Sequence, residues 1–302
     1  MEKKFEIESS TGKKIAGRIW RQERKEYKGI IQLVHGMQEH IGRYTEFAKF
    51  LSQKGYIVIG HDHLGHGETV KSEEEYGHFS DKQGWSNLVD DIHKVQAFAK
   101  KEYPDLKYTI FGHSMGSLLV RTYITKYKDK IDKVIICGTS GKRLGIISGI
   151  FLIKLMKIFL GKKYKSELIE YLVTGSFNKK FNPNRTVADW TSRDQESVDE
   201  FISDKKCLKN FTLQAYEDLL KGSLYVSKQK NVNKSIKVPI LITSGDKDPV
   251  GENAKGVIRV YKMFEKGNYE VDIRLFKDAR HELLNEINKE EVFGYILNWI
   301  EK

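Results

Sequence analysis

The sequence predicts an α/β fold in which helices cover both faces of a mostly parallel sheet. Short apolar runs typical of buried strands alternate along the chain with longer helix-like stretches. The strand-like runs at 133–138 and 239–245 are separated by roughly a hundred residues, which is too long for an ordinary connection. A chain of 302 residues suits one such domain with an insertion. We therefore expect a core at 1–142, a helical insertion at 143–232 and a second core part at 233–302.

The strands can be placed in order along the chain. Segments 5–8 and 15–20, joined by a Thr-Gly turn, predict an opening antiparallel hairpin. Further strands are expected at 30–34, 56–59, 108–111, 133–138, 239–245 and 269–276. Together these segments predict an eight-stranded sheet.

The most informative stretch is Gly-His-Ser-Met-Gly at 112–116, which directly follows one of these strands. A G-x-S-x-G sequence between a strand and a helix is typical of a nucleophile elbow, a tight turn that lifts a serine hydroxyl above the sheet. Gly112 and Gly116 are expected to keep the turn free of clashes. Ser114 is therefore the candidate nucleophile.

A serine hydroxyl needs a base to remove its proton and an acid to orient that base. His281 follows the strand at 269–276, and Asp248 follows the strand at 239–245, in the order expected for such an elbow. We predict that His281 acts as general base and then general acid, and that Asp248 holds its ring. Asp246 is a competitor for the acid, but a carboxylate so close to the strand more often caps the turn.

An oxyanion hole needs two donors aimed at the oxygen that becomes negative. One is expected to be the backbone N–H of Met115, and the other that of Met37, in the loop after the strand at 30–34. Gly36 permits the turn that presents Met37. The loss of one such donor typically costs about 3 kcal/mol of transition-state stabilisation.

Several motifs together resemble one family. They are His-Gly-x-x-Glu-His-x-x-Arg-Tyr at 35–44, Asp-His-x-Gly-His-Gly at 62–67, the elbow itself, and Ala-Arg-His-Glu-Leu-Leu-Asn-Glu at 279–286. In this order they are similar to segments of monoacylglycerol lipases and bacterial lysophospholipase-like hydrolases. The resemblance runs from about Lys13 to the C-terminus, is weakest between Arg143 and Val232, and departs at Ser117, where the family often has glycine.

This resemblance implies an α/β-hydrolase fold with a mainly helical cap inserted into it. It also implies a serine hydrolase that cleaves fatty acyl esters, of monoacylglycerol or lysophospholipid type, through an acyl-enzyme. The roles that it implies for Ser114, Asp248 and His281 agree with those argued above. The substrate is then a small-molecule acyl ester.

The insertion begins with an apolar run at 144–160 that predicts a helix. One interpretation is a helix packed on both sides within the protein. The other is a helix that roofs an acyl-chain pocket and makes transient contact with a membrane or micelle. Lys154 and Lys157 and the length of the run argue against a membrane span.

Composition removes several other classes of function. Cys137 and Cys207 suggest neither a disulfide framework nor a metal pair, and the N-terminus lacks the apolar region of a signal peptide, so a cytoplasmic enzyme is expected. The net charge of +11 comes mostly from dispersed lysines without a nucleic-acid motif, so no nucleic-acid partner is expected. The histidine-rich run at 61–66 has its acid in the wrong place for a metal site. We expect no metal and no cofactor.

Two rival functions stay open. One is a serine aminopeptidase of the same fold, although such relatives usually carry tryptophan where this chain has Met115, and they need acids near the substrate amine. The other is a small-ligand receptor that has lost hydrolysis.

Overall fold

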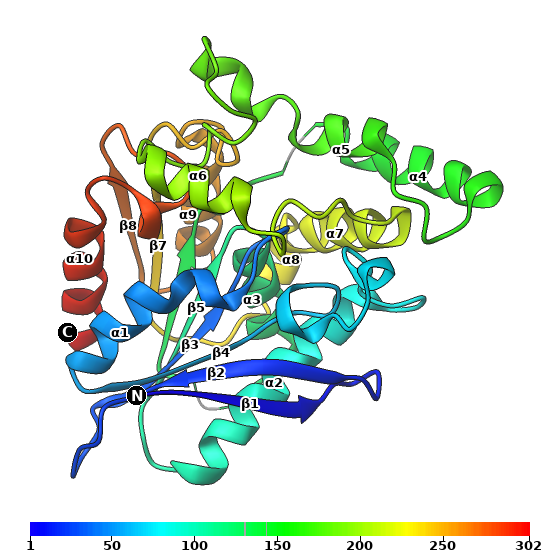
Figure 1. Cartoon of the computed structure of the whole chain (residues 1–302). Helices are drawn as coiled ribbons and strands as arrows, with labels where there is room; N and C mark the ends of the chain where they lie inside the picture. The colour runs from blue at the N-terminus through cyan, green and yellow to red at the C-terminus, as the bar shows by residue number, and fades with distance from the viewer. Residues whose placement is uncertain (130, 143) are drawn as a thin grey trace.

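The computed structural model describes residues 1–129, 131–142 and 144–302, so the expected first residue of the insertion, 143, lies outside the described residues. Figure 1 shows a single sheet with helices on both sides, and a helical insertion at the end of the molecule away from the two termini. No helix within these ranges is long and apolar enough to cross a lipid bilayer.

The sheet has eight strands in the order β1-β2-β4-β3-β5-β6-β7-β8. The pairs β1–β2 and β2–β4 are antiparallel, and all other neighbouring pairs are parallel. The prediction of a mostly parallel eight-stranded sheet with an opening hairpin is therefore confirmed. The strands are β1 (Glu2–Glu8), β2 (Lys14–Trp20), β3 (Gly29–Val34), β4 (Tyr56–His61), β5 (Tyr108–His113), β6 (Lys133–Cys137), β7 (Ile240–Gly245) and β8 (Val271–Phe276).

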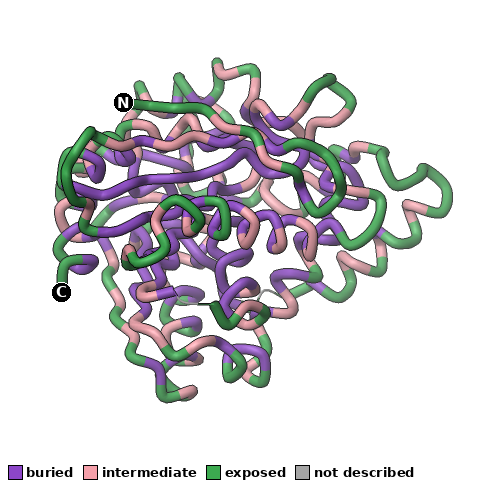
Figure 2. Tube along the Cα trace, turned by 90° about the horizontal axis from the view of Figure 1, so that it is seen from below, coloured by how far each residue is buried: buried purple, intermediate pink, exposed green. Residues whose placement is uncertain are grey.

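Two helical layers enclose the sheet. Alternate side chains of a strand point to opposite faces, so Ile31 and Leu33 of β3 pack with α1 (Thr45–Gln53) and α10 (Lys289–Glu301). Ile30 and Val34 pack on the other face with α2 (Gly84–Glu102), α3 (Met115–Lys126) and α9 (Lys255–Lys266). Because both faces are covered, β3 to β5 are buried along their whole length, as Figure 2 shows.

The insertion between β6 and β7 is helical, and its helices differ in how deeply they pack. Helix α7 lies against α2 and α3, whereas α4 packs mainly on α7. Only Ile146 and Ile153 of α4 are buried, while Phe151, Ile158 and Phe159 are at least 70% exposed. The interpretation of this run as a helix packed on both sides is therefore wrong. The helices here are α4 (Ile146–Leu160), α5 (Glu167–Thr174), α6 (Gln195–Ser203), α7 (Leu213–Val226) and α8 (Gln229–Val232).

Short 3-10 turns occur at the loops that surround the end of the sheet. They are η1 (Ile41–Tyr44), η2 (Gly67–Thr69), η3 (Glu73–Glu75), η4 (Phe177–Phe181) and η5 (Leu283–Asn285). The carboxyl ends of β3, β5, β7 and β8 thus lead into the loops that carry the sequence motifs, and parallel strands bring these loops to the same edge.

Candidate active site

Ser114 occupies a strained turn between β5 and α3. Its φ of 53° and ψ of −119° lie outside the regions that non-glycine residues prefer. A Cβ at Gly112 would lie 2.5 Å from the Gly116 carbonyl oxygen, and one at Gly116 would lie 2.1 Å from the Val34 carbonyl oxygen. The turn therefore needs both glycines because its backbone approaches neighbouring backbone too closely for a side chain.

A carboxylate and an imidazole meet beside this turn. Asp248 Oδ1 lies 3.0 Å from His281 Nδ1, and both side chains are buried. The same carboxylate accepts hydrogen bonds from the Ser244 hydroxyl (2.9 Å) and the Val250 N–H (2.9 Å). Burial alone raises the pKa of Asp248, but the charge and hydrogen bond of His281 outweigh it, and the pKa lies below its ordinary value.

The competing carboxylate takes a different position. Asp246 Oδ1 accepts the backbone N–H of Asp278 at 2.8 Å, which joins the turn after β7 to the turn after β8. The structure thus brings Asp248 to His281 and leaves Asp246 as a turn cap.

Ser114, His281, Met37 and Met115 all line one cavity of about 490 Å³. Within the described residues, the Ser114 hydroxyl and the imidazole line the same cavity but are not hydrogen-bonded to each other. The N–H of Met115 belongs to the first residue of α3, which has no partner within its helix. The other walls are mainly apolar and come largely from the insertion, including Ile146, Val173, Phe177, Val187, Trp190, Phe201, Leu208, Leu219 and Leu220.

Polar side chains also line the cavity, which the sequence did not indicate. Gln38, next to the expected oxyanion donor Met37, donates a hydrogen bond from Nε2 to Glu170 Oε1 at 3.1 Å. Glu167 lines the cavity as well, so α5 contributes two carboxylates to it. These groups can accept hydrogen bonds from hydroxyl or ammonium groups of a substrate.

A buried charged network lies behind the elbow. Glu39 Oε1 accepts the Gly36 N–H (2.6 Å) and the Tyr44 hydroxyl (2.8 Å), and it lies 3.3 Å from His113 Nδ1. Burial raises the pKa of Glu39, but His113 and the charge of Arg43 outweigh it and lower that pKa to about 2. The carboxylate therefore stays charged while it holds the turn at Gly36.

The same network reaches the loop of His281. His113 Nε2 lies 3.2 Å from the backbone carbonyl of His281, so both ring nitrogens of His113 face acceptors. Burial lowers the pKa of His113, but the hydrogen bond and charge of Glu39 outweigh it and raise the pKa above its ordinary value. Arg43 completes the network with two hydrogen bonds to Glu282, of 2.8 Å and 2.6 Å.

A further glycine touches the imidazole, and sequence reasoning missed it. Gly138, directly after β6, has a φ of +58°. A Cβ at this position would lie 3.1 Å from His281 Cε1 and 3.2 Å from His113 Cδ2. A glycine after a strand is common, so no signal in the sequence pointed to this contact.

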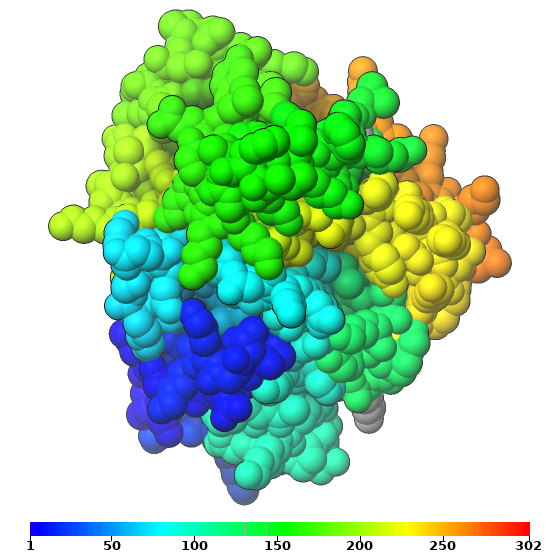
Figure 3. Space-filling model, turned by 90° about the vertical axis from the view of Figure 1, so that its right-hand side faces the viewer, coloured from blue at the N-terminus to red at the C-terminus, as the bar shows by residue number. Residues whose placement is uncertain are grey.

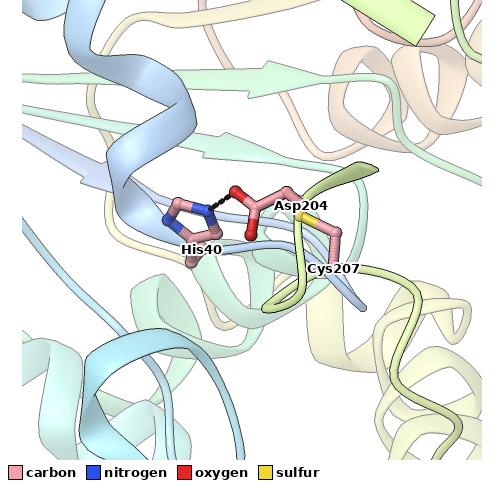
Figure 4. A group of neighbouring side chains, drawn as sticks. All are labelled: His40, Asp204 and Cys207. Atoms are coloured by element: carbon pink, nitrogen blue, oxygen red, sulfur yellow. Dashed lines mark hydrogen bonds and ion pairs between the residues drawn. The ribbon is translucent and has the colours of Figure 1, made fainter. Parts of the chain in front are cut away.

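Three side chains of metal-ligating type gather where the insertion meets the loop after β3. The ligand atoms of His40, Asp204 and Cys207 lie within 4.8 Å of one another. Figure 4 shows the three side chains and the bond between His40 and Asp204. His40 Nδ1 accepts the Gly42 N–H at 3.1 Å, so the neutral ring carries its proton on Nε2 and donates it to Asp204 Oδ2 at 2.8 Å. A metal ion on Nε2 needs that nitrogen's lone pair, so this arrangement fits a clasp between insertion and core better than a metal centre.

Several side chains of the histidine-rich run at 61–66 are hydrogen-bonded to backbone N–H and carbonyl groups of nearby loops. His63 Nε2 lies 3.3 Å from the His35 carbonyl oxygen, and His66 Nε2 accepts the Gln38 N–H at 3.3 Å. Asp62 accepts the N–H groups of Ile41 and Glu68 at 2.7 Å each. These residues hold the loop that contains Met37.

Comparison with known proteins relates the chain to one family. The family described as "Serine aminopeptidase, S33" matches residues 25–288. Monoacylglycerol lipase of Mycolicibacterium smegmatis is 26% identical over 276 residues, which cover 90% of this chain and 88% of that protein. Human monoglyceride lipase is 26% identical over 282 residues, which cover 91% of this chain and 83% of that protein.

Solved structures show the same fold. A thermostable carboxyl esterase from Bacillus coagulans, in complex with glycerol, superposes with a TM-score of 0.93 at 26% identity, covering 99% of this chain and 98% of the esterase. Monoglyceride lipase from Saccharomyces cerevisiae, in complex with a substrate analogue, superposes with a TM-score of 0.74 at 17% identity, covering 95% and 91% of the two chains.

Proposed function

The chain belongs to the serine aminopeptidase S33 family, on the monoacylglycerol lipase-like branch of the α/β-hydrolases, and we propose that it hydrolyses fatty acyl esters with Ser114 as nucleophile. The observation that carries this proposal is the buried Asp248–His281 pair beside Ser114, in a cavity with apolar walls. A substrate with an apolar acyl chain and a reactive ester bond fits such a cavity.

The proposed reaction has two stages. Ser114 Oγ attacks the ester carbonyl carbon while His281 Nε2 accepts its proton, and the N–H groups of Met37 and Met115 stabilise the oxyanion. His281 then returns the proton to the oxygen of the leaving alcohol, and the acyl group remains on Ser114. Water repeats the sequence and releases the carboxylic acid. Asp248 keeps the imidazole oriented and balances its positive charge in both stages.

We propose monoacylglycerols as the substrate class that this cavity fits best. The apolar walls suit a single acyl chain. The amide of Gln38 can donate hydrogen bonds to glycerol hydroxyls, and the carboxylate of Glu170 can accept hydrogen bonds from them. A lysophospholipid would place its phosphate near the carboxylates of Glu167 and Glu170, where like charges repel. The monoglyceride lipases among the relatives support the same choice.

The first test is the hydrolysis of p-nitrophenyl esters from C2 to C16 by the wild type and by Ser114→Ala. The loss of one triad member should lower kcat by roughly 10⁴- to 10⁶-fold. Activity that peaks at medium or long chains and disappears in Ser114→Ala supports the proposal, and monoacylglycerol should then be cleaved faster than the lysophospholipid of the same chain. Equal activity of Ser114→Ala at all lengths refutes it.

A serine aminopeptidase is the second candidate, because Glu167 and Glu170 in the cavity can bind a substrate ammonium group. Aminoacyl naphthylamides test it directly. Their release of naphthylamine, at rates above those for the esters, would favour the peptidase. Labelling of Ser114 by a fluorophosphonate separates either enzyme from a receptor, which would not react.

We further propose that α4 contacts a membrane surface. Figure 3 shows α4 and α5 on the outside of the molecule, where Ile147, Phe151, Ile158 and Phe159 are exposed beside Lys154. Such an apolar and cationic surface suits an anionic lipid interface. In cosedimentation with vesicles of phosphatidylglycerol and phosphatidylcholine, the double variant Phe151→Ser/Phe159→Ser should lose binding.

The matched control for this experiment is Ile287→Ser, which removes an exposed apolar side chain outside the insertion. It should bind vesicles like the wild type. Equal binding of the wild type and the double variant would rule out the contact through α4.

A further inference from the structure

One stretch of the insertion is bonded to the loop that carries His281 as well as to its own neighbours η4 and α6. Residues 188–194 follow η4 in the chain, yet their backbone and side chains join the segment that surrounds His281. The bonds are Glu282 N–H to Thr191 O (2.7 Å), Ser192 Oγ to Asn285 O (2.7 Å), Arg193 Nε to Glu286 Oε2 (2.9 Å) and Arg280 Nη1 to Ser192 O (3.1 Å).

Trp190 is presented from this stretch to the reacting imidazole. Its ring centroid lies 5.1 Å from that of His281, and the interplanar angle of 36° makes the contact tilted and closer to stacked than to edge-on. The ring centroid of Phe177 lies 4.9 Å from that of Trp190, and Asn178 Oδ1 accepts the backbone N–H of Trp190 at 2.9 Å. Trp190 is half-buried and lines the cavity that contains Ser114.

The charged groups near His281 reach its imidazole from other elements than Trp190 does. Asp248, from the loop after β7, lies 3.0 Å from Nδ1 of His281. His113, at the end of β5, has its ring 4.7 Å away, and its pKa is raised, so a positive charge there opposes one on His281. Glu39 and Arg43 act on the imidazole through His113, and Glu282 is bonded to Arg43. The indole, like His113, borders both the imidazole and the cavity, but unlike His113 it is uncharged.

We propose that Trp190 is a further catalytic residue, whose indole face stabilises the imidazolium that His281 becomes in each transition state. An aromatic face attracts a cation within about 6 Å of its centroid, and tryptophan does so most strongly. A neutral imidazole gains much less from this contact than an imidazolium does. The interaction therefore strengthens as the proton is transferred, which is the condition for it to raise kcat. This inference rests on the role proposed above for His281.

The test compares Trp190→Phe and Trp190→Leu with the wild type on p-nitrophenyl butyrate between pH 5 and 9. Trp190→Leu should lower kcat by about 3- to 30-fold, and Trp190→Phe by less, because phenylalanine keeps a weaker aromatic face. The acid limb of the kcat/KM profile should move to lower pH by up to about one unit, because the positive ring has lost a stabilising partner. Circular dichroism and thermal unfolding check that both variants are folded.

Tyr171→Leu is the matched control, because Tyr171 also lines the cavity and its ring neighbour in the described contacts is Lys179. It should change KM but leave the acid limb in place. The inference is overturned if Trp190→Leu, like the control, changes KM but neither kcat nor the acid limb. It is also overturned if Trp190→Phe loses as much kcat as Trp190→Leu, because Trp190 would then contribute only packing. Should Ser114→Ala and His281→Ala retain full activity, the proposed function fails, and that result is distinct from the first.

Discussion

Gly138 offers a test of how closely the position of the imidazole is controlled. In Gly138→Ala the new methyl group would lie 3.1 Å from His281 Cε1, which is a few tenths of an ångström inside ordinary contact. The φ of +58° adds strain that is independent of this contact, about 1 kcal/mol for an alanine. We therefore expect two separate effects, a loss of stability and a displacement of His281.

The displacement sets the expected loss of activity. A misplacement of about 1 Å can cost about 100-fold in rate, so a shift of a few tenths of an ångström should lower kcat by about 3- to 10-fold. KM should change little, because Gly138 is not among the residues that line the substrate cavity. The assay is steady-state hydrolysis of p-nitrophenyl butyrate, together with thermal unfolding, in which the midpoint should fall by about 2 °C.

Gly12→Ala is the matched control. Gly12 has a φ of +80° and no atom within 4 Å of the added Cβ, and it lies in the turn between β1 and β2. It carries the same kind of strain without a contact, so its stability should fall by a similar amount while kcat stays unchanged. If the two variants have equal kcat, the position of His281 does not depend on the space at Gly138, and the reasoning is refuted.

Three further predictions concern the groups around the site. The pKa of Glu39 is lowered from its ordinary value of 4.5 to about 2, so the charged carboxylate stabilises the folded protein above pH 4.5, and this stability is lost as the pH falls toward 2. Urea unfolding midpoints should therefore fall more steeply between about pH 6 and pH 3 in the wild type than in Glu39→Gln, and parallel curves would contradict this. Asp204→Leu removes the acceptor of His40 and should lower the unfolding free energy by about 1 kcal/mol in urea titrations, whereas an unchanged midpoint would deny the clasp a role in stability. Glu170→Leu should reduce the preference for a monoacylglycerol over the methyl ester of the same acid by about 10-fold in kcat/KM, and an unchanged ratio would exclude Glu170 from head-group recognition.

The strands and the loops that carry the motifs could be predicted because their signals are local. The runs 30–34 and 240–245 each begin with consecutive large aliphatic residues, as is typical of a strand buried on both faces, and the structure has β3 and β7 there. The order of Ser114, Asp248 and His281 along the chain, each after a strand, sufficed to nominate all three. The structure brings Asp248 to His281 and places Ser114 on the wall of the same cavity, while their chemical roles remain our proposal.

The packing of the insertion was harder to predict, because the sequence of an apolar helix does not specify which surfaces it packs against. The apolar run at 144–160 was compatible with a helix enclosed on both sides, and the structure instead packs it mainly on α7. The stretch at 188–194 attaches the insertion to the core through residues such as Arg193, and it also carries Trp190 to the imidazole of His281, which no local signal in the sequence indicates.

By itself, the sequence determined the elements, the strained turn at Ser114 and the set of candidate reacting groups, because hydrophobic periodicity and glycine spacing act over a few residues. Only the tertiary structure decided which groups meet across long separations. Gln38 and Glu170 are 132 residues apart, and His113 and His281 are 168 apart. Such contacts depend on how whole layers pack, and a buried carboxylate or indole takes its role from the partners that the packing supplies.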